Sequence, residues 1–115
     1  VTGSRVLVLG LTFKENTPDL RNTRIVDVIE ELTDYGIEVD VHDPWADAVE
    51  AKKHYGLDLL SELVDGTYQG IIVAVGHEEY REWGVERIHA LGHDEGHVLY
   101  DLKYVLPSED VHLRL

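Results

Sequence analysis

A polar segment after the first apolar run carries two basic side chains that are suited to binding an anion. The segment covers residues 10–23 and holds Lys14 and Arg21, in a chain with 10 basic against 23 acidic residues. Cations between a strand end and a helix start suit a phosphate or another anion. The alternative is that Lys14 and Arg21 only pair with Glu15 and Asp19, and the pattern itself favours neither interpretation.

A third cation, Lys103, follows the last apolar run, residues 98–100. In a parallel sheet the carboxyl ends of the strands share one edge, so Lys14 and Lys103 would lie on the same edge. Two lysines from separate strand ends can hold one anionic ligand. The alternative interpretation of Lys103 is a solvated surface lysine.

The same edge carries half of a dinucleotide-binding pattern. Gly10 ends the first apolar run, but Leu11 and Thr12 follow where further glycines would let backbone amides approach a pyrophosphate. Asp43 ends the second predicted strand, as a ribose-binding acid would. Because Pro44 comes next, we favour the interpretation of Asp43 as a turn residue.

The seven histidines predict no metal centre. His89, His93 and His97 are four residues apart, but Gly92 and Gly96 interrupt a shared helical face and no cysteine assists. We therefore expect no metal site. The spacing of a Ser-His-Asp triad is also missing, and we expect no catalytic residue in this chain.

His77 follows the most apolar run, residues 71–75, and would face the ligand edge. It can bind a ligand there or order its own loop through Glu78 or Glu79. We favour the loop-ordering interpretation.

Apolar runs alternate with helical periodicity along the whole chain. Helix ends are predicted at Gly36 and Gly56, and an interruption of a helix is predicted at Gly84. We predict strands at 5–10, 37–41, 71–75 and 98–100, and helices at 25–34, 46–55, 59–64 and 78–91. Such alternation indicates parallel β-α-β units. We expect one α/β domain over residues 1–115, a small doubly wound, mostly parallel Rossmann-like sheet with helices on both faces.

Composition limits the partners and the surroundings of the chain. The net charge of −13 and the pI near 4.7 disfavour nucleic acid and anionic membranes as partners. The absence of cysteine, of a signal peptide and of an apolar run near ~20 residues favours a cytoplasmic location. The acidity indicates either adaptation to high salt (a halophilic source) or an ordinary acidic cytoplasmic domain. Val1 in place of Met indicates a piece of a longer protein.

Four segments in order resemble the C-terminal domain of the UDP-glucose/GDP-mannose dehydrogenase family. They are Gly-Leu-Thr-Phe-Lys-Glu-Asn-Thr-Pro-Asp-Leu-Arg-Asn-Thr (10–23), Val-His-Asp-Pro (41–44), Val-Ala-Val-Gly-His-Glu-Glu-Tyr (73–80) and Tyr-Asp-Leu-Lys (100–103). The first segment is most similar to UDP-N-acetylhexosamine 6-dehydrogenases of bacteria and archaea, which supply uronic acids for surface polysaccharides.

The resemblance implies a part of an oxidoreductase. Family enzymes oxidise the sugar C6 alcohol to a carboxylate in two hydride transfers to NAD. NAD is bound mainly by an N-terminal Rossmann domain, and a middle region supplies the dimer helices and the catalytic cysteine. This chain has no cysteine, so the resemblance implies a UDP-sugar-binding fragment, inactive alone, of a protein that forms a homodimer or a larger assembly.

The resemblance also implies roles for four residues. Phe13 and Lys14 match positions that touch the nucleotide sugar, and Arg21 matches a position that reaches the NAD. Lys103 matches a basic substrate-binding position that is often Arg, whereas Tyr104 departs from the family's usual Gly or Arg. The alternative function is a free-standing, non-catalytic α/β module that binds a nucleotide or a protein.

Overall fold

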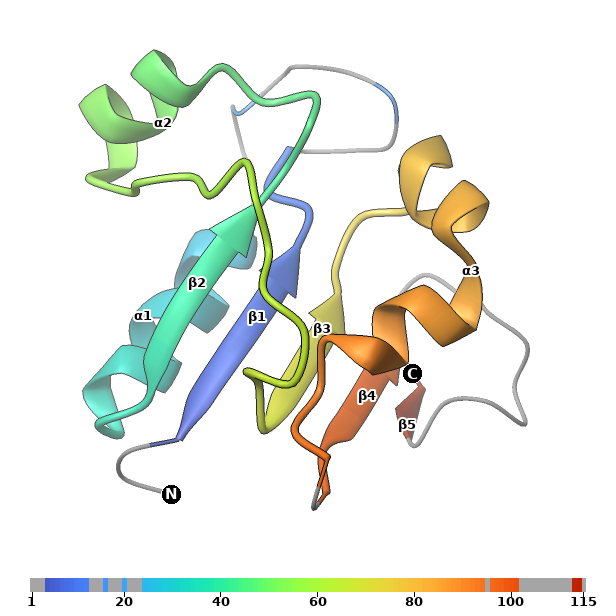
Figure 1. The fold of residues 1–115 in the computed structure, drawn as a ribbon. Helices are drawn as coiled ribbons and strands as arrows, with labels where there is room; N and C mark the ends of the chain where they lie inside the picture. The colour runs from blue at the N-terminus through green and yellow to red at the C-terminus, as the bar shows by residue number, and fades with distance from the viewer. Residues whose placement is uncertain are drawn as a thin grey trace.

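The chain folds into a parallel sheet between helices in the computed structural model, which describes residues 4–12, 16, 20, 24–94, 96–101 and the backbone of 113–114. The strands are β1 (Arg5–Leu9), β2 (Glu38–His42), β3 (Gly70–Val73), β4 (Val98–Asp101) and β5 (Leu113–Arg114). The helices are α1 (Ile25–Asp34), α2 (Ala48–Tyr55) and α3 (Glu78–Ala90). The strand order is β2-β1-β3-β4-β5, and every pair is parallel (Figure 1).

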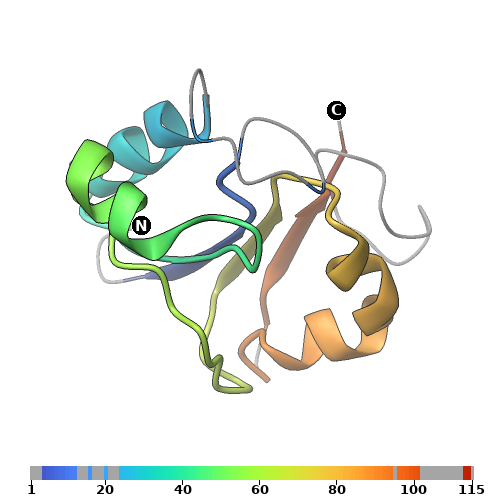
Figure 2. The ribbon, with the colours of Figure 1, turned by 90° about the horizontal axis from the view of Figure 1, so that it is seen from above.

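Apolar side chains alternate across β1 and build a core on each face of the sheet. Leu7 and Leu9 pack with Tyr80 and Ile88 of α3. Val8 points to the other face, where the core includes residues of α1 and α2. Seen from above, α1 and α2 lie on one side of the sheet and α3 on the other (Figure 2). The predicted doubly wound sheet is confirmed.

Capping residues set the helix ends. Asp47 accepts hydrogen bonds from the amides of Val49 (2.8 Å) and Glu50 (3.2 Å), so α2 begins at Ala48, two residues later than predicted. It ends at Gly56, whose φ of 69° is left-handed. Gly84, at φ 77° and ψ 167°, breaks α3 as predicted.

The predicted helix at 59–64 is wrong. Leu59 instead forms a parallel bridge with Val41, and the Leu60 amide donates to the Val41 carbonyl at 2.8 Å. Because β2 is the edge strand, its outer carbonyl needs a donor, and this extended segment supplies one. The two-residue strand β5 was not predicted. Among the described helices, none is long and apolar enough to cross a membrane.

Candidate functional site

The chain reverses its winding direction at the carboxyl ends of β1 and β3. β2 pairs with one side of β1 and β3 with the other, which is where open α/β sheets place ligands. Gly10 follows β1 with φ +107°, and a Cβ there would lie 2.6 Å from Val75 Cβ. The loops after β1 and β3 therefore run in direct contact, and only glycine fits at position 10.

Asp43 fills the space beside the end of β1 with its carboxylate. Oδ2 accepts hydrogen bonds from the amides of Leu11 (2.6 Å) and Thr12 (3.0 Å). Oδ1 accepts from the amides of Trp45 (2.8 Å) and Ala46 (3.1 Å). The predicted turn role is confirmed by the Oδ1 contacts, while the Oδ2 contacts tie the turn to the first loop.

His77 is the third member of this buried group. Its Nε2 lies 3.0 Å from Asp43 Oδ2 and 3.1 Å from Thr12 Oγ1, and its Nδ1 accepts the Asn16 amide at 2.8 Å. An Nδ1 that accepts an N–H carries no proton, so the ring is neutral and its proton is on Nε2. Nε2–H therefore donates to the Asp43 carboxylate, and the two side chains are fully buried.

His77 orders its loop as predicted, but not through Glu78 or Glu79. The partners that the structure gives it come from the loop after β1 and from the end of β2, between 34 and 65 residues away. Glu79 instead accepts a hydrogen bond from Trp45 Nε1 at 2.8 Å. Glu78 and Glu79 are the first two residues of α3.

Opposing effects act on the pKa of Asp43. Burial alone would raise it, but hydrogen bonds from His77 and from the amides of Leu11 and Thr12 outweigh burial. The net result is a pKa below the ordinary aspartate value. Asp43 is thus a stable buried anion.

Asn16 joins the first loop to α3. Its φ of 55° is left-handed, a conformation that asparagine tolerates better than most residues. Its Oδ1 accepts the amide of Glu78, the first residue of α3, at 2.9 Å. This contact satisfies one of the amides that a helix start leaves open. Sequence reasoning missed Thr12 and Asn16, because no local pattern distinguishes them from other loop residues.

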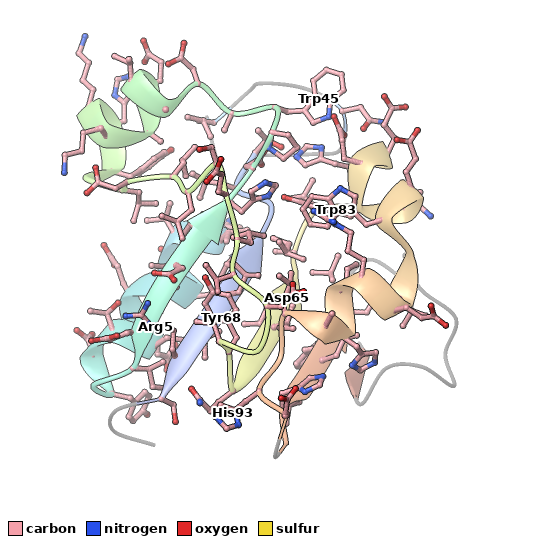
Figure 3. All side chains as sticks on the ribbon, in the orientation of Figure 1. Arg5, Trp45, Asp65, Tyr68, Trp83 and His93 are labelled. Carbon is pink, nitrogen blue, oxygen red and sulfur yellow. The ribbon has the colours of Figure 1, made fainter. Side chains whose placement is uncertain are left out.

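Trp45 covers the buried group on its outer side. Its indole stacks on the His77 ring, with centroids 6.0 Å apart and planes 27° apart. The Nε1–H donates to Glu79, so Trp45 lies beside the start of α3 (Figure 3). The turn after β2 is therefore fixed to the start of α3 across the sheet edge.

The predicted binding residues Phe13, Lys14, Arg21 and Lys103 lie outside the described residues. Their described neighbours lie at the expected edge. Thr12 and Asn16 flank positions 13–15, and the buried Asp101 ends β4.

The pyrophosphate of NAD does not fit on the backbone amides of Leu11 and Thr12, the described amides directly after Gly10. In dinucleotide-binding sheets these amides approach the phosphates. Here the amides of Leu11 and Thr12 already donate to the Asp43 carboxylate, which would also repel a second anion. This end of β1 is occupied by the protein's own anion.

Two of the spaced histidines contact each other. His89 Nδ1 lies 2.7 Å from His97 Nε2, and His97 Nδ1 lies 3.2 Å from the His93 carbonyl oxygen. Gly92 makes room for the His97 ring, since a Cβ there would overlap the ring atoms of His97. Within the described part of the chain, no group of three or more side chains is arranged to hold a metal ion.

Known proteins match the chain over nearly its full length. The family model "UDP-glucose/GDP-mannose dehydrogenase family, UDP binding domain" matches residues 7–108. The UDP-N-acetyl-D-glucosamine 6-dehydrogenase of Salmonella typhi is 55% identical over 115 residues, 100% of this chain and 27% of the relative. The same-named enzyme of Pseudomonas aeruginosa is 53% identical over 115 residues, with the same coverage.

Solved structures agree with this assignment. A UDP-glucose dehydrogenase from the archaeon Pyrobaculum islandicum superposes with a TM-score of 0.72 at 30% identity, covering 99% of this chain and 25% of that one. The chain thus spans about a quarter of the length of each of these three proteins. The resemblance carried by residues 10–23, 41–44, 73–80 and 100–103 is confirmed: the chain belongs to the UDP-glucose/GDP-mannose dehydrogenase family, as its UDP binding domain.

Proposed function

We propose that this chain is the nucleotide-sugar-binding domain of an NAD-dependent UDP-sugar 6-dehydrogenase. The observation that carries the proposal is identity of 55% and 53%, over the whole chain, to two UDP-N-acetyl-D-glucosamine 6-dehydrogenases. The proposed substrate class is UDP-N-acetylhexosamine, whose C6 alcohol is oxidised to a carboxylate. The product would be a uronic acid for surface polysaccharides.

The proposed binding residues are Phe13, Lys14 and Lys103 for the UDP-sugar and Arg21 for NAD. The Asp43 contacts support a role for side chains, because the amides of Leu11 and Thr12, directly after β1, already donate to the Asp43 carboxylate. A diphosphate at this edge would therefore need cations such as Lys14 and Lys103.

The proposed mechanism assigns binding and orientation to this chain. Lys14 and Lys103 neutralise the diphosphate and fix the sugar, so that C6 is held toward groups of the rest of the protein. NAD, when bound, accepts the hydride. The contacts of the Leu11 and Thr12 amides with Asp43 support NAD binding mainly by another domain. The chain has no cysteine, so a covalent thiohemiacetal step would need a cysteine from outside it.

NADH formation by the full-length protein tests this proposal. UDP-N-acetylglucosamine, UDP-N-acetylgalactosamine, UDP-N-acetylmannosamine and UDP-glucose are compared as substrates. Lys14→Ala should raise KM for the preferred sugar roughly tenfold or more, since a charge-assisted contact contributes about 1.5–3 kcal/mol. Lys53→Ala, on the exposed side of α2, is the matched control and should leave KM unchanged. UDP-sugar binding without NADH formation would support the non-catalytic module instead.

We further propose a cytoplasmic, salt-adapted protein that forms a homodimer or larger assembly. The support for salt adaptation is the density of exposed acids, for example Asp27, Glu30, Glu31 and Asp34 on α1. Such a surface repels itself in dilute buffer, and salt screens the repulsion. Size-exclusion chromatography of the full-length protein with light scattering tests the assembly, and a monomer would contradict it.

A further inference from the structure

One imidazole holds both ends of the three-residue segment that contains Phe13 and Lys14. His77 Nε2 lies 3.1 Å from Thr12 Oγ1, just before the segment. His77 Nδ1 accepts the amide of Asn16, just after it, at 2.8 Å. We call these two contacts the His77 bridge.

The His77 bridge is itself held rigidly. Asp43 Oδ2 accepts Nε2–H at 3.0 Å, which fixes the tautomer and the ring plane. Trp45 stacks on the ring, and Asn16 is held a second time by the Glu78 amide at 2.9 Å. The ring is fully buried, so solvent does not compete for its two nitrogen atoms.

From this geometry we infer that His77 is a positioning residue for UDP-sugar binding. It acts on the two residues that flank positions 13–15: it fixes the distance between Thr12 and Asn16, and the proposed contacts Phe13 and Lys14 come between them in the sequence. This inference rests on the proposed function and adds to it a residue that does not itself touch the substrate. Holding these two flanking residues in place before the ligand arrives lowers the entropic cost of binding.

The chemistry of His77 suggests variants that keep either its contact with the Asn16 amide or its contact with the Asp43 carboxylate. In His77→Asn, the side-chain oxygen lies near the position of Nδ1 and can still accept the Asn16 amide. In His77→Gln, the side-chain NH2 lies near Nε2 and can still donate to Asp43. His77→Phe fills the space and makes neither bond.

The test measures UDP binding to the full-length protein by titration calorimetry, with Lys14→Ala and a double-mutant cycle. His77→Phe should weaken UDP binding about tenfold, whereas His77→Asn and His77→Gln should each show a smaller loss. In the Lys14→Ala background, the His77→Phe change should cost less than about twofold, since the residue that it positions is gone. If His77→Phe does not fold, the same cycle is run with His77→Gln.

A control separates positioning from general stability. Tyr80→Phe removes a buried hydroxyl that donates to the His42 carbonyl at 2.8 Å. The centroid of the Tyr80 ring lies 5.8 Å from that of the His77 ring. This substitution should lower the thermal midpoint and leave the UDP affinity unchanged.

The outcomes are distinguishable. If Lys14→Ala weakens UDP binding but the His77 variants bind like the wild type, the positioning role is overturned and the proposed function stands. Equal, additive losses from His77→Phe in both backgrounds also overturn it. If the wild type does not bind UDP, or Lys14→Ala binds it equally well, the proposed binding role fails and the inference fails with it.

Discussion

The buried Nε2–H of His77 donates to Oδ2 of Asp43 at 3.0 Å, and this contact joins the end of β2 to the connection between β3 and α3. The same oxygen accepts two amides from the loop after β1. Three segments from distant parts of the sequence thus converge on one carboxylate. The edge of the sheet that other α/β proteins leave open for a phosphate is here organised by an internal anion.

Asp43→Asn should lower the free energy of unfolding by about 2–4 kcal/mol. An amide NH2 at this position would face two backbone N–H groups, either those of Leu11 and Thr12 or those of Trp45 and Ala46. Urea unfolding followed by circular dichroism measures the change. The matched control is Asp47→Asn at the exposed start of α2, where both residue types cap well and a change within about 0.5 kcal/mol is expected. Equal effects of the two substitutions would contradict the role of Asp43.

The advantage of the wild type over Asp43→Asn should depend on pH in a defined direction. The pKa of Asp43 is lowered in the folded state, so its contribution is fully present above the unfolded aspartate pKa of about 4. It is lost as the pH falls from there through the folded pKa. Urea unfolding of both proteins at several pH values between about 7 and 3 tests this. If the difference in free energy of unfolding between the two proteins disappears near pH 6, protonation of a histidine controls that difference instead.

Gly10→Ala should destabilise the domain by about 3 kcal/mol. A Cβ at Gly10 would lie 2.6 Å from Val75 Cβ and 2.8 Å from the Val75 amide nitrogen, in a residue with φ +107°. Gly66→Ala is the matched control, because Gly66 has φ +71° but nothing within 4 Å of an added Cβ. In Gly66→Ala the free energy of unfolding should fall by only about 1 kcal/mol, the cost of placing alanine in a left-handed backbone conformation. Thermal and urea unfolding measure the stability of both variants. Equal losses of stability in Gly10→Ala and Gly66→Ala would show that the contact with Val75 is unimportant.

Stability should rise with salt concentration. With a net charge of −13, repulsion among exposed acids is strong in dilute buffer and is screened over about 3 Å in 1 M salt. The free energy of unfolding is measured in KCl from 0.1 to 2 M, since chloride salts screen charge with little other stabilisation. The triple variant Glu30→Gln, Glu31→Gln and Asp34→Asn removes three charges from the exposed face of α1. It should reach a given free energy of unfolding at a lower salt concentration than the wild type. Equal stability in dilute and molar salt would remove the proposed adaptation.

Strands β1 to β4 and helices α1 to α3 could be predicted from the sequence, and so could the sheet edge at which the candidate site lies. Alternation of apolar runs with helical periodicity predicts a parallel sheet, since each element must bury one face. The break at Gly84 was also predictable, because the conformational freedom of glycine is a local property of the backbone and needs no distant partner.

Which residues organise that edge depends on the completed fold. The contacts of His77 with Thr12 and Asn16 join residues 65 and 61 positions apart, and no local pattern specifies such a pairing. The segment at 59–64 shows the same limit: its apolar spacing predicted a helix, but the unpaired Val41 carbonyl of the edge strand draws it into an extended bridge. Periodicity reports which face an element buries, whereas the partners of buried polar groups depend on what the completed fold brings within hydrogen-bonding distance.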